Sequence, residues 1–336
     1  MAKIWDEGIN NIPYEAIEDY YEYKGRLLEK KVYTVGSQLI TSYKKIKPVV
    51  NVQKVKRKSF KIRLSGRSTD YISPSFGHGC LYNCSYCYMK RNKPNGLSIA
   101  TNTEEILSEI NKHAWFAQME IAKPNQTHKT YITYDISCNE DFALHAKHHE
   151  WRKIFKFFRD HDTAMGSFAT KYVNPDLISF DPKGKIRIRF SLMPQCKADI
   201  HEPNTSKIID RIKAINAFID AGYDVHVNYS PIIVYDKWLD DYEELFNMMN
   251  DYVDYKSEVL AECIFLTHNE NRHNYNLVQN PKAEEDLWKP NEQEFKTSQY
   301  GGTNLRYRSG LKRQFIDQFI RLHNRVIPWN KIRYIF

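Results

Sequence analysis

The chain uses cysteine sparingly and lacks any long apolar run. It has six cysteines in 336 residues, and no stretch approaches the roughly 18 apolar residues that a membrane-spanning helix needs. Its first residues, Met1-Ala-Lys-Ile-Trp-Asp6, have no apolar core of the kind found in secretion signals. These absences argue against a disulfide-bonded secreted protein and against a membrane protein. The sequence predicts a cytoplasmic protein with reduced thiols.

Acidic residues are missing from one segment near the N-terminus. The whole chain carries a net charge of +8, but the segment from Thr41 to Arg67 has no acid at all and contains ten cations: Lys44, Lys45, Lys47, Lys54, Lys56, Arg57, Lys58, Lys61, Arg63 and Arg67. Such a run is often a solvated face. Apolar residues alternate with the cations over 59–64, which predicts a strand. An ordered basic strand favours contacts with nucleic-acid phosphates, although charge alone does not distinguish DNA from RNA.

Half of the cysteines lie in a single loop. Cys80, Cys84 and Cys87 have C-x3-C-x2-C spacing, and three thiolates on one loop can hold three irons of a 4Fe-4S cube while the fourth iron stays open. A structural zinc site needs a fourth protein ligand, and a ferredoxin cluster needs a fourth cysteine. Neither follows at a suitable spacing. A fragment of a zinc site, or three unrelated thiols, is the plain alternative.

The rest of the chain alternates between strand and helix patterns. Strands are predicted at 129–136, 163–171, 186–193, 225–234 and 258–267, with helices between them and a last helix at about 311–324. Counting from the segment before Cys80, this gives about six strand–helix repeats, which favours an α/β fold with an incomplete (β/α)6 barrel. Its active site should lie at the carboxyl ends of the strands. We divide the chain into a basic N-terminal extension (1–70), the partial barrel (71–268) and a C-terminal loop and helix that complete the substrate face (269–336).

The cysteine spacing followed by an aromatic residue, Tyr88, is the signature loop of radical S-adenosylmethionine (SAM) enzymes, and the chain resembles that superfamily. Short matches at the strand ends make it similar to the spore photoproduct lyase family from about residue 73 onward. These matches are Cys84-Ser85-Tyr86-Cys87-Tyr88, Cys138, Thr170-Lys171, Arg189-x-Ser191-Leu192, and Thr267-His268 followed by Arg272. Glu140 departs from the family's pattern, in which a small hydroxyl residue is more typical.

The resemblance implies the cofactors and a reaction. A 4Fe-4S cluster on Cys80, Cys84 and Cys87 would reduce SAM to a 5′-deoxyadenosyl radical, which takes a hydrogen from the thymine dimer called spore photoproduct, so that the linking carbon–carbon bond breaks. Cys138 stands where the family keeps a thiol that returns the hydrogen.

Four further positions are implied in the same way. Tyr86 and Tyr88 match tyrosines that relay a hydrogen atom. Lys171 and Ser191 match positions that hold SAM, where a lysine suits the carboxylate. The plain alternatives are that Cys138 is a small buried residue, that the tyrosines only pack, and that Lys171 and Ser191 are a structural pair at the barrel mouth.

The implied partners are damaged DNA, expected as a duplex, and an electron donor such as a flavodoxin or ferredoxin, with no membrane. Two other functions stay open. One is a radical SAM enzyme that acts on a different substrate, such as modified RNA or a peptide. The other is a non-enzymatic protein that binds an iron–sulfur cluster or zinc.

Overall fold

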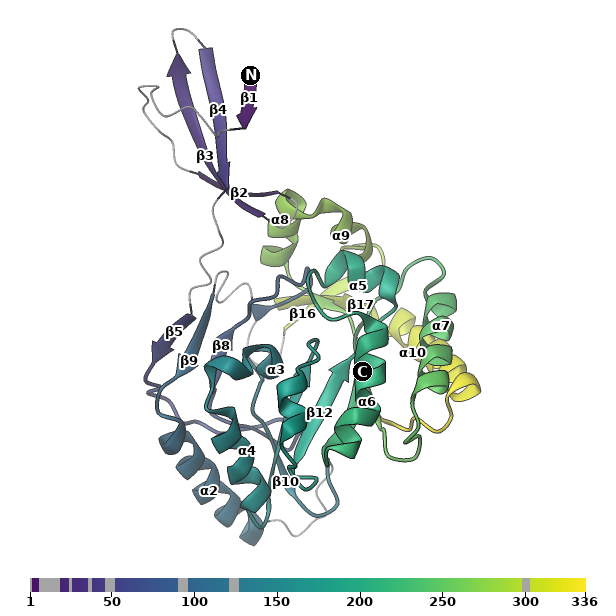
Figure 1. Ribbon diagram of the computed structural model, residues 1–336. Helices are drawn as coiled ribbons and strands as arrows, with labels where there is room; N and C mark the ends of the chain where they lie inside the picture. The colour runs from purple at the N-terminus through teal and green to yellow at the C-terminus, as the bar shows by residue number, and fades with distance from the viewer. Residues whose placement is uncertain are drawn as a thin grey trace. The chain divides into compact units, whose positions relative to one another are not determined.

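The computed structural model divides the chain into two units, Met1–Asn51 and Val52–Phe336. It describes the backbone of four strands in the first unit and residues 52–89, 96–120, 127–297 and 303–336 of the second (Figure 1). The four strands of the first unit are β1 (Ala2–Trp5), β2 (Asp19–Tyr23), β3 (Arg26–Val35) and β4 (Gln38–Lys45). They form a sheet in the order β1-β4-β3-β2, in which only β1 and β4 pair in parallel.

The second unit is built on an eight-stranded sheet whose order is β18-β14-β13-β12-β11-β10-β7-β6. Its strands are β6 (Arg63–Leu64), β7 (Tyr71–Ile72), β10 (Ile132–Asp135), β11 (Ala164–Thr170), β12 (Ile186–Ser191), β13 (Asp224–Ile232), β14 (Ala261–Phe265) and β18 (Ile332–Ile335). All neighbours pair in parallel except β6 and β7. The six strands from β7 to β14 follow one another in sequence and in space. The expected α/β fold with an incomplete (β/α)6 barrel is therefore confirmed.

Helices cover the outside of this sheet because each crossover between parallel strands must return along one face. They are α2 (Thr103–Glu120), α3 (Phe142–His145), α4 (Trp151–Asp160), α5 (Gln195–His201), α6 (Ile208–Asp220), α7 (Trp238–Tyr252), α8 (Glu270–Gln279), α9 (Pro281–Leu287) and α10 (Ser309–Val326). Figure 1 shows β12 between α4 and α6, with α2 beside α4. Phe142 packs between Phe155 and Phe168, with ring centroids 5.6 and 5.3 Å away, and this aromatic group joins α3 and α4 to β11.

Two short sheets flank the barrel strands. The sheet β5-β9-β8 pairs β5 (Val52–Val55), β9 (Leu97–Ala100) and β8 (Gly77–Gly79), and it ends directly before Cys80. The sheet β15-β17-β16 pairs β15 (Thr267–His268), β17 (Thr303–Tyr307) and β16 (Gln293–Thr297). The first sheet leads into the cysteine loop. The second sheet is formed by strands that lie between β14 and α10 in the sequence.

Two predictions of secondary structure were wrong, one before the cysteine loop and one after the last predicted barrel strand. The strand predicted over 59–64 is limited to Arg63–Leu64, the two residues of this stretch that pair with β7. The C-terminal loop predicted to begin at residue 269 contains α8, α9 and β16. Helix α8 buries Arg272 and Asn276, and α9 buries Glu284 and Asp286 beside Ala283 and Leu287. Neither short helix therefore has the apolar stripe that would predict it.

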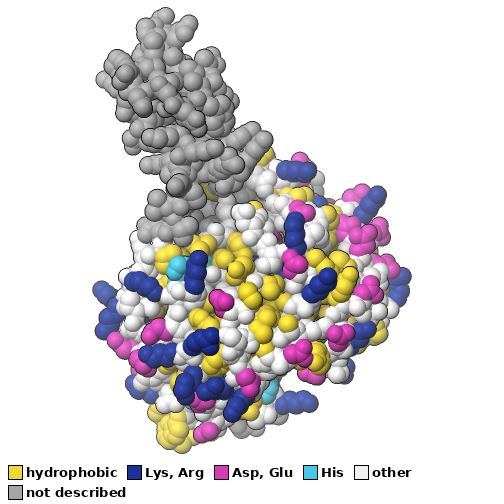
Figure 2. Space-filling view, in the orientation of Figure 1, with side chains coloured by type: hydrophobic (Ala, Val, Ile, Leu, Met, Phe, Trp, Pro, Cys, Tyr) yellow, Lys and Arg dark blue, Asp and Glu magenta, His cyan; other side chains and the backbone are white. Residues whose placement is uncertain are grey.

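The surface bears on the expected partners. On the face shown in Figure 2, lysine and arginine side chains lie among aspartate and glutamate side chains, so this face does not present a single sign of charge. Among the described residues, no helix is long and apolar enough to cross a membrane.

Candidate active site

The cysteine loop lies against the turn that follows β10. The Gly79 amide donates to the carbonyl of Asn139 at 3.0 Å, and the Cys87 amide donates back to the carbonyl of Cys84 at 3.1 Å. None of the three cysteines forms a disulfide, and Cys84 is buried. Burial raises the pKa of Cys84 well above its usual range, while the nearby Lys171 ammonium acts in the opposite direction. A buried thiol of this kind becomes a stable thiolate only beside positive charge, which an iron ligated by the loop would supply.

Cys138 occupies the tight turn after β10. The Ser137 amide donates to Asp135 Oδ1 at 2.8 Å and the Glu140 amide to the Ser137 carbonyl at 3.1 Å, which fixes the backbone on both sides of Cys138. The Tyr88 hydroxyl, one residue past the last loop cysteine, donates to the Cys138 carbonyl at 2.7 Å. Burial, helped by the Asp135 carboxylate, raises the pKa of Cys138 to about 11. The thiol therefore keeps its proton at neutral pH.

Glu202, in the loop after α5, joins the remaining predicted residues. It accepts the hydroxyl of Tyr86 and lies 3.9 Å from Lys171 Nζ, and Lys171 in turn lies 5.8 Å from the centre of the Tyr86 ring. Arg211 Nη2 donates to Glu202 Oε2 at 2.9 Å, and Arg211 Nη1 donates to the Ser191 carbonyl at 2.7 Å. Burial would lower the pKa of Lys171, but the charges of Glu202 and Cys84 outweigh it and raise the pKa.

Glu140, which departs from the family pattern, supports the cysteine loop through His145. Its carboxylate is fully buried and accepts from His145 Nδ1 at 2.9 Å and His149 Nε2 at 2.8 Å. The other nitrogen of His145 accepts the Leu81 amide of the cysteine loop at 3.3 Å. A Cβ on Gly77 would lie 2.2 Å from the Glu140 carboxylate, so glycine is required there for this approach.

The structure thus brings the predicted residues into two groups beside the cysteine loop. One group joins Tyr88 to Cys138, and the other joins Tyr86 and Lys171, with the backbone of Ser191, through Glu202 and Arg211. Sequence reasoning missed Glu202 and Arg211. Arg211 could have been found, because it falls among Ile208, Ile212 and Ile215 on the apolar stripe of α6, where a charged residue needs a buried partner. Glu202 gives no comparable signal.

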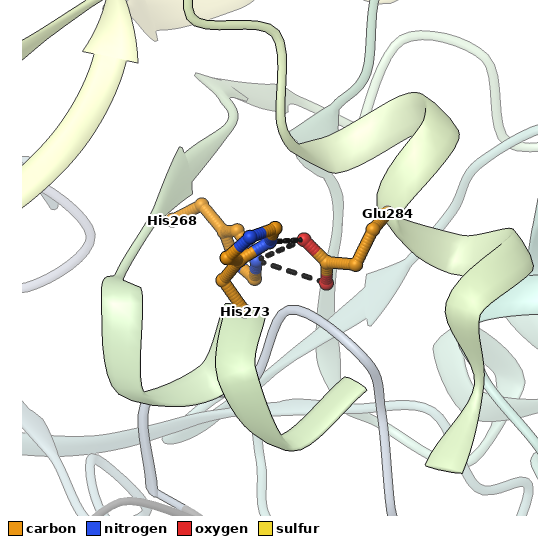
Figure 3. A group of neighbouring side chains, drawn as sticks. All are labelled: His268, His273 and Glu284. Atoms are coloured by element: carbon orange, nitrogen blue, oxygen red, sulfur yellow. Dashed lines mark hydrogen bonds and ion pairs between the residues drawn. The ribbon is translucent and has the colours of Figure 1, made fainter. Parts of the chain in front are cut away.

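A second group of potential metal ligands lies outside the cysteine loop. Figure 3 shows His268, His273 and Glu284, whose ligand atoms lie within 4.8 Å of one another. Histidine nitrogens and a carboxylate are a common donor set for zinc or iron(II). In this structure the Glu284 carboxylate accepts from both histidines and from Asn276, so its oxygens already have hydrogen-bond donors.

Six parallel strands wound with helices, with three cysteines on a loop after the first, define a partial barrel of the radical SAM type. The particular family follows from the sequence comparison. The model of the family described as spore photoproduct lyase matches residues 30–336, and the chain belongs to that family.

Individual relatives agree with this placement. The chain is 29% identical over 198 residues to the spore photoproduct lyase of Bacillus subtilis, and the match covers 58% of this chain and 55% of that protein. It is 28% identical over 195 residues to the enzyme of the same name from a Geobacillus species, covering 56% and 54%. The chain thus spans about half the length of these curated relatives.

Solved structures share the fold. A spore photoproduct lyase variant solved with dinucleoside spore photoproduct superposes with a TM-score of 0.75 at 23% identity, over 85% of this chain and 82% of that one. Another variant, solved with bound AdoMet and the same dinucleoside, gives a TM-score of 0.75 at 22% identity over the same shares.

Proposed function

We propose that this protein is a cytoplasmic radical SAM lyase that splits a thymine photodimer of the spore photoproduct type. The observation that best supports the proposal is the hydrogen bond from the Tyr88 hydroxyl to the Cys138 carbonyl, which holds this cysteine beside a tyrosine one residue beyond the three-cysteine loop. A carbon–carbon lyase that uses a radical must return a hydrogen atom to its product. A thiol held as S–H beside a phenol is suited to this step.

Cys80, Cys84 and Cys87 are the proposed ligands of a 4Fe-4S cluster, and Lys171 and Ser191 the proposed contacts of SAM. When bound, these cofactors supply the 5′-deoxyadenosyl radical. Lys171 remains charged beside Cys84 and Glu202, which suits it to the SAM carboxylate. Arg211 donates to the Ser191 carbonyl at the end of β12, which supports the backbone of this proposed contact.

Cys138 is the proposed hydrogen donor, and Tyr88 and Tyr86 the proposed relay. Tyr88 contacts Cys138 directly. Burial, together with the charge of Glu202, raises the pKa of Tyr86 well above its usual range, so this phenol keeps the hydrogen that a relay must pass on.

The proposed substrate is damaged duplex DNA, and the proposed reductant is a flavodoxin or ferredoxin. The related solved structures hold dinucleoside spore photoproduct, which supports a lesion of this kind. The domain division at 70/71 and 268/269 belongs to the same proposal. The contact of α8 with the cysteine loop supports a role for the C-terminal region at the site.

Anaerobic reconstitution followed by product analysis tests this function. The wild-type chain should contain about four irons and four sulfides, should release 5′-deoxyadenosine from SAM, and should convert irradiated dinucleotide to thymine. Cys84→Ala should lose the cluster and SAM cleavage. Stoichiometric zinc without sulfide would indicate the non-enzymatic alternative. SAM cleavage without dimer repair would indicate a radical SAM enzyme with another substrate.

A further inference from the structure

Helix α8 holds the cysteine loop from outside the barrel. Arg272 and Asn276 stand four residues apart on this helix and so share a face. Arg272 Nε donates to the Ser85 carbonyl at 2.9 Å, and its Nη2 donates to the Cys84 carbonyl at 2.9 Å. Asn276 Nδ2 donates to the same Ser85 carbonyl at 2.7 Å. The backbone between the second and third cysteines is therefore fixed by two side chains of one helix.

Arg272 is a buried cation with neutral acceptors. It is 4% exposed, its remaining acceptors belong to Asn83, and no ion pair is found for it within the part of the chain that the structure describes. Burying a charge without an ionic partner is costly. Burial lowers the pKa of Arg272, while the charges of Tyr275, Cys87 and Cys84 act against this effect. The cost would be offset by negative charge on the cysteine loop.

The helix that carries Arg272 is itself fixed by Glu284 of α9. The Glu284 carboxylate accepts from Asn276 Nδ2 at 2.5 Å, from His273 Nδ1 at 2.5 Å and from His268 Nε2 at 3.2 Å. Figure 3 shows both histidines directed at this carboxylate. The Trp288 ring stacks on His273, with centroids 3.8 Å apart. One carboxylate thus joins β15, α8 and α9 behind the loop.

We infer that Arg272 is a positioning residue that holds the cysteine loop and stabilises the added electron on the reduced cluster, with Asn276 and Glu284 fixing the helix from which it acts. This inference rests on the proposed function, because it requires a cluster on Cys80, Cys84 and Cys87. Reduction adds a negative charge to the cluster. A fixed cation in a buried, weakly screened site favours the more negative state.

The midpoint potential of the cluster, measured by anaerobic redox titration with EPR detection, tests the effect of the charge. In Arg272→Gln the equilibrium constant for one-electron reduction should fall about tenfold, which lowers the potential by about 59 mV. Arg272→Lys keeps the charge and should keep the potential. Arg321→Gln, which removes an exposed cation from α10, is the matched control and should also leave the potential unchanged.

Loss of iron to a chelator tests the holding of the loop. Arg272→Lys should lose iron faster than wild type because an ammonium cannot reproduce the planar fork of a guanidinium. Asn276→Ala should also lose iron faster, without a change in potential. An Arg272→Gln chain that folds but takes up no cluster supports the holding role, and the charge is then tested by Arg272→Lys alone.

Several outcomes would overturn the inference. One is a loaded Arg272→Gln chain with wild-type potential and wild-type iron retention. Another is a tenfold fall in the equilibrium constant for cluster reduction in Arg272→Lys. Because this variant keeps the positive charge, such a fall would mean that the charge does not set the potential. One zinc per wild-type chain that is lost in His273→Gln would make Glu284 a metal ligand rather than a hydrogen-bonding partner. A wild-type chain without any cluster would instead refute the proposed function.

Discussion

Replacing Cys138 can distinguish its proposed role as a hydrogen donor from a purely structural role in packing. In Cys138→Ala the first turnover should still release 5′-deoxyadenosine, because the thiol acts only after the dimer has been opened. The product radical then lacks its donor, so other reductants should trap it as off-pathway adducts, and SAM should be consumed rather than regenerated. Mass spectrometry of the products measures this change.

Cys196→Ala is the matched control for that experiment. Cys196 is an exposed thiol on α5 that bonds to Asp241, so its removal should leave products and SAM use unchanged. If Cys138 only packs, its replacement should cost on the order of 1 kcal/mol of stability and the product spectrum should stay that of wild type. Clean thymine from Cys138→Ala would exclude the donor role.

The pKa of Cys138 predicts how the thiol responds to pH. Its pKa is raised to about 11 by burial and by Asp135, so the S–H form that can give a hydrogen atom persists through neutral and mildly alkaline pH. Alkylation of Cys138 by iodoacetamide in the cluster-loaded protein, followed site by site with mass spectrometry, should rise only above about pH 10. A half-maximal rate near pH 8.5, the value of an ordinary cysteine, would contradict this environment.

The sequence identified the residues proposed to take part in the reaction better than the residues that hold those side chains in place. Cys138 and Lys171 could be proposed because each lies shortly after the end of a strand and matches a family motif. Glu202 has no motif and sits in a loop, and its importance depends on Arg211 reaching it from another element. A partner that is brought close only by tertiary packing leaves no pattern in the sequence.

At the level of elements, the turn after β10 and helices α3 and α4 depend on Glu140. Glu140→Ala should destabilise the protein by about 3 to 5 kcal/mol, because it leaves the buried histidines His145 and His149 without their acceptor. Glu104→Ala is the control, since Glu104 is an exposed acid on α2 that pairs with Lys153, a residue whose side chain is also accessible to solvent. Its unfolding free energy should stay close to that of wild type. Chemical denaturation of both variants measures the difference, and equal values would contradict the role of Glu140.

The same carboxylate gives a pH dependence. Burial would raise the pKa of Glu140, but His149 and His145 outweigh it and lower the pKa to about 2. A lowered pKa stabilises the fold at pH values above the unfolded value of about 4.3, and this stability is lost as pH falls toward 2. Wild type should therefore lose stability across this range more steeply than Glu140→Ala.

The helices that the sequence did not predict, α8 and α9, show why part of the site was missed. Their buried residues include Arg272, Asn276 and Glu284, which look like surface residues in a sequence. Hydrogen bonds to one another and to the cysteine loop satisfy these groups, so burial does not require an apolar stripe. Periodicity detects helices that pack through hydrocarbon, and it therefore found α6 and α10 but not these two.

At the level of the whole molecule, the barrel could be predicted because strands and helices alternate, but the closure of its edges could not. β18 joins β14 at one edge, and Glu262 there bonds to Arg333 at 3.1 Å and to Ser68 at 2.8 Å. Glu262 thus meets residues 71 and 194 positions away in the chain. No local pattern encodes such a contact.

The basic segment allows the proposed binding of DNA to be tested. Its cations are not equivalent, because Arg57 donates to the carbonyls of Ser75 and Ser98 and so serves the fold, whereas Lys58 and Lys61 are exposed. The side chains of Lys44, Lys45 and Lys47 lie outside the described residues. Lys58 and Lys61 are therefore the residues with which phosphate contact is tested.

Replacing Lys58 and Lys61 together by Gln should weaken binding to duplex DNA of any sequence and should flatten its salt dependence. Each phosphate contact that is lost reduces the slope of log K against log salt by about 0.9, so the double variant should lose about 1.8 from the slope. Lys213→Gln with Arg321→Gln removes the same charge from exposed positions on α6 and α10 and should leave the slope unchanged. Fluorescence anisotropy over a range of salt concentrations measures both variants. Equal slopes in wild type and in the Lys58 and Lys61 variant would place the segment on a solvated face instead, because counterion release depends on which cations touch phosphate and not on the net charge of the chain.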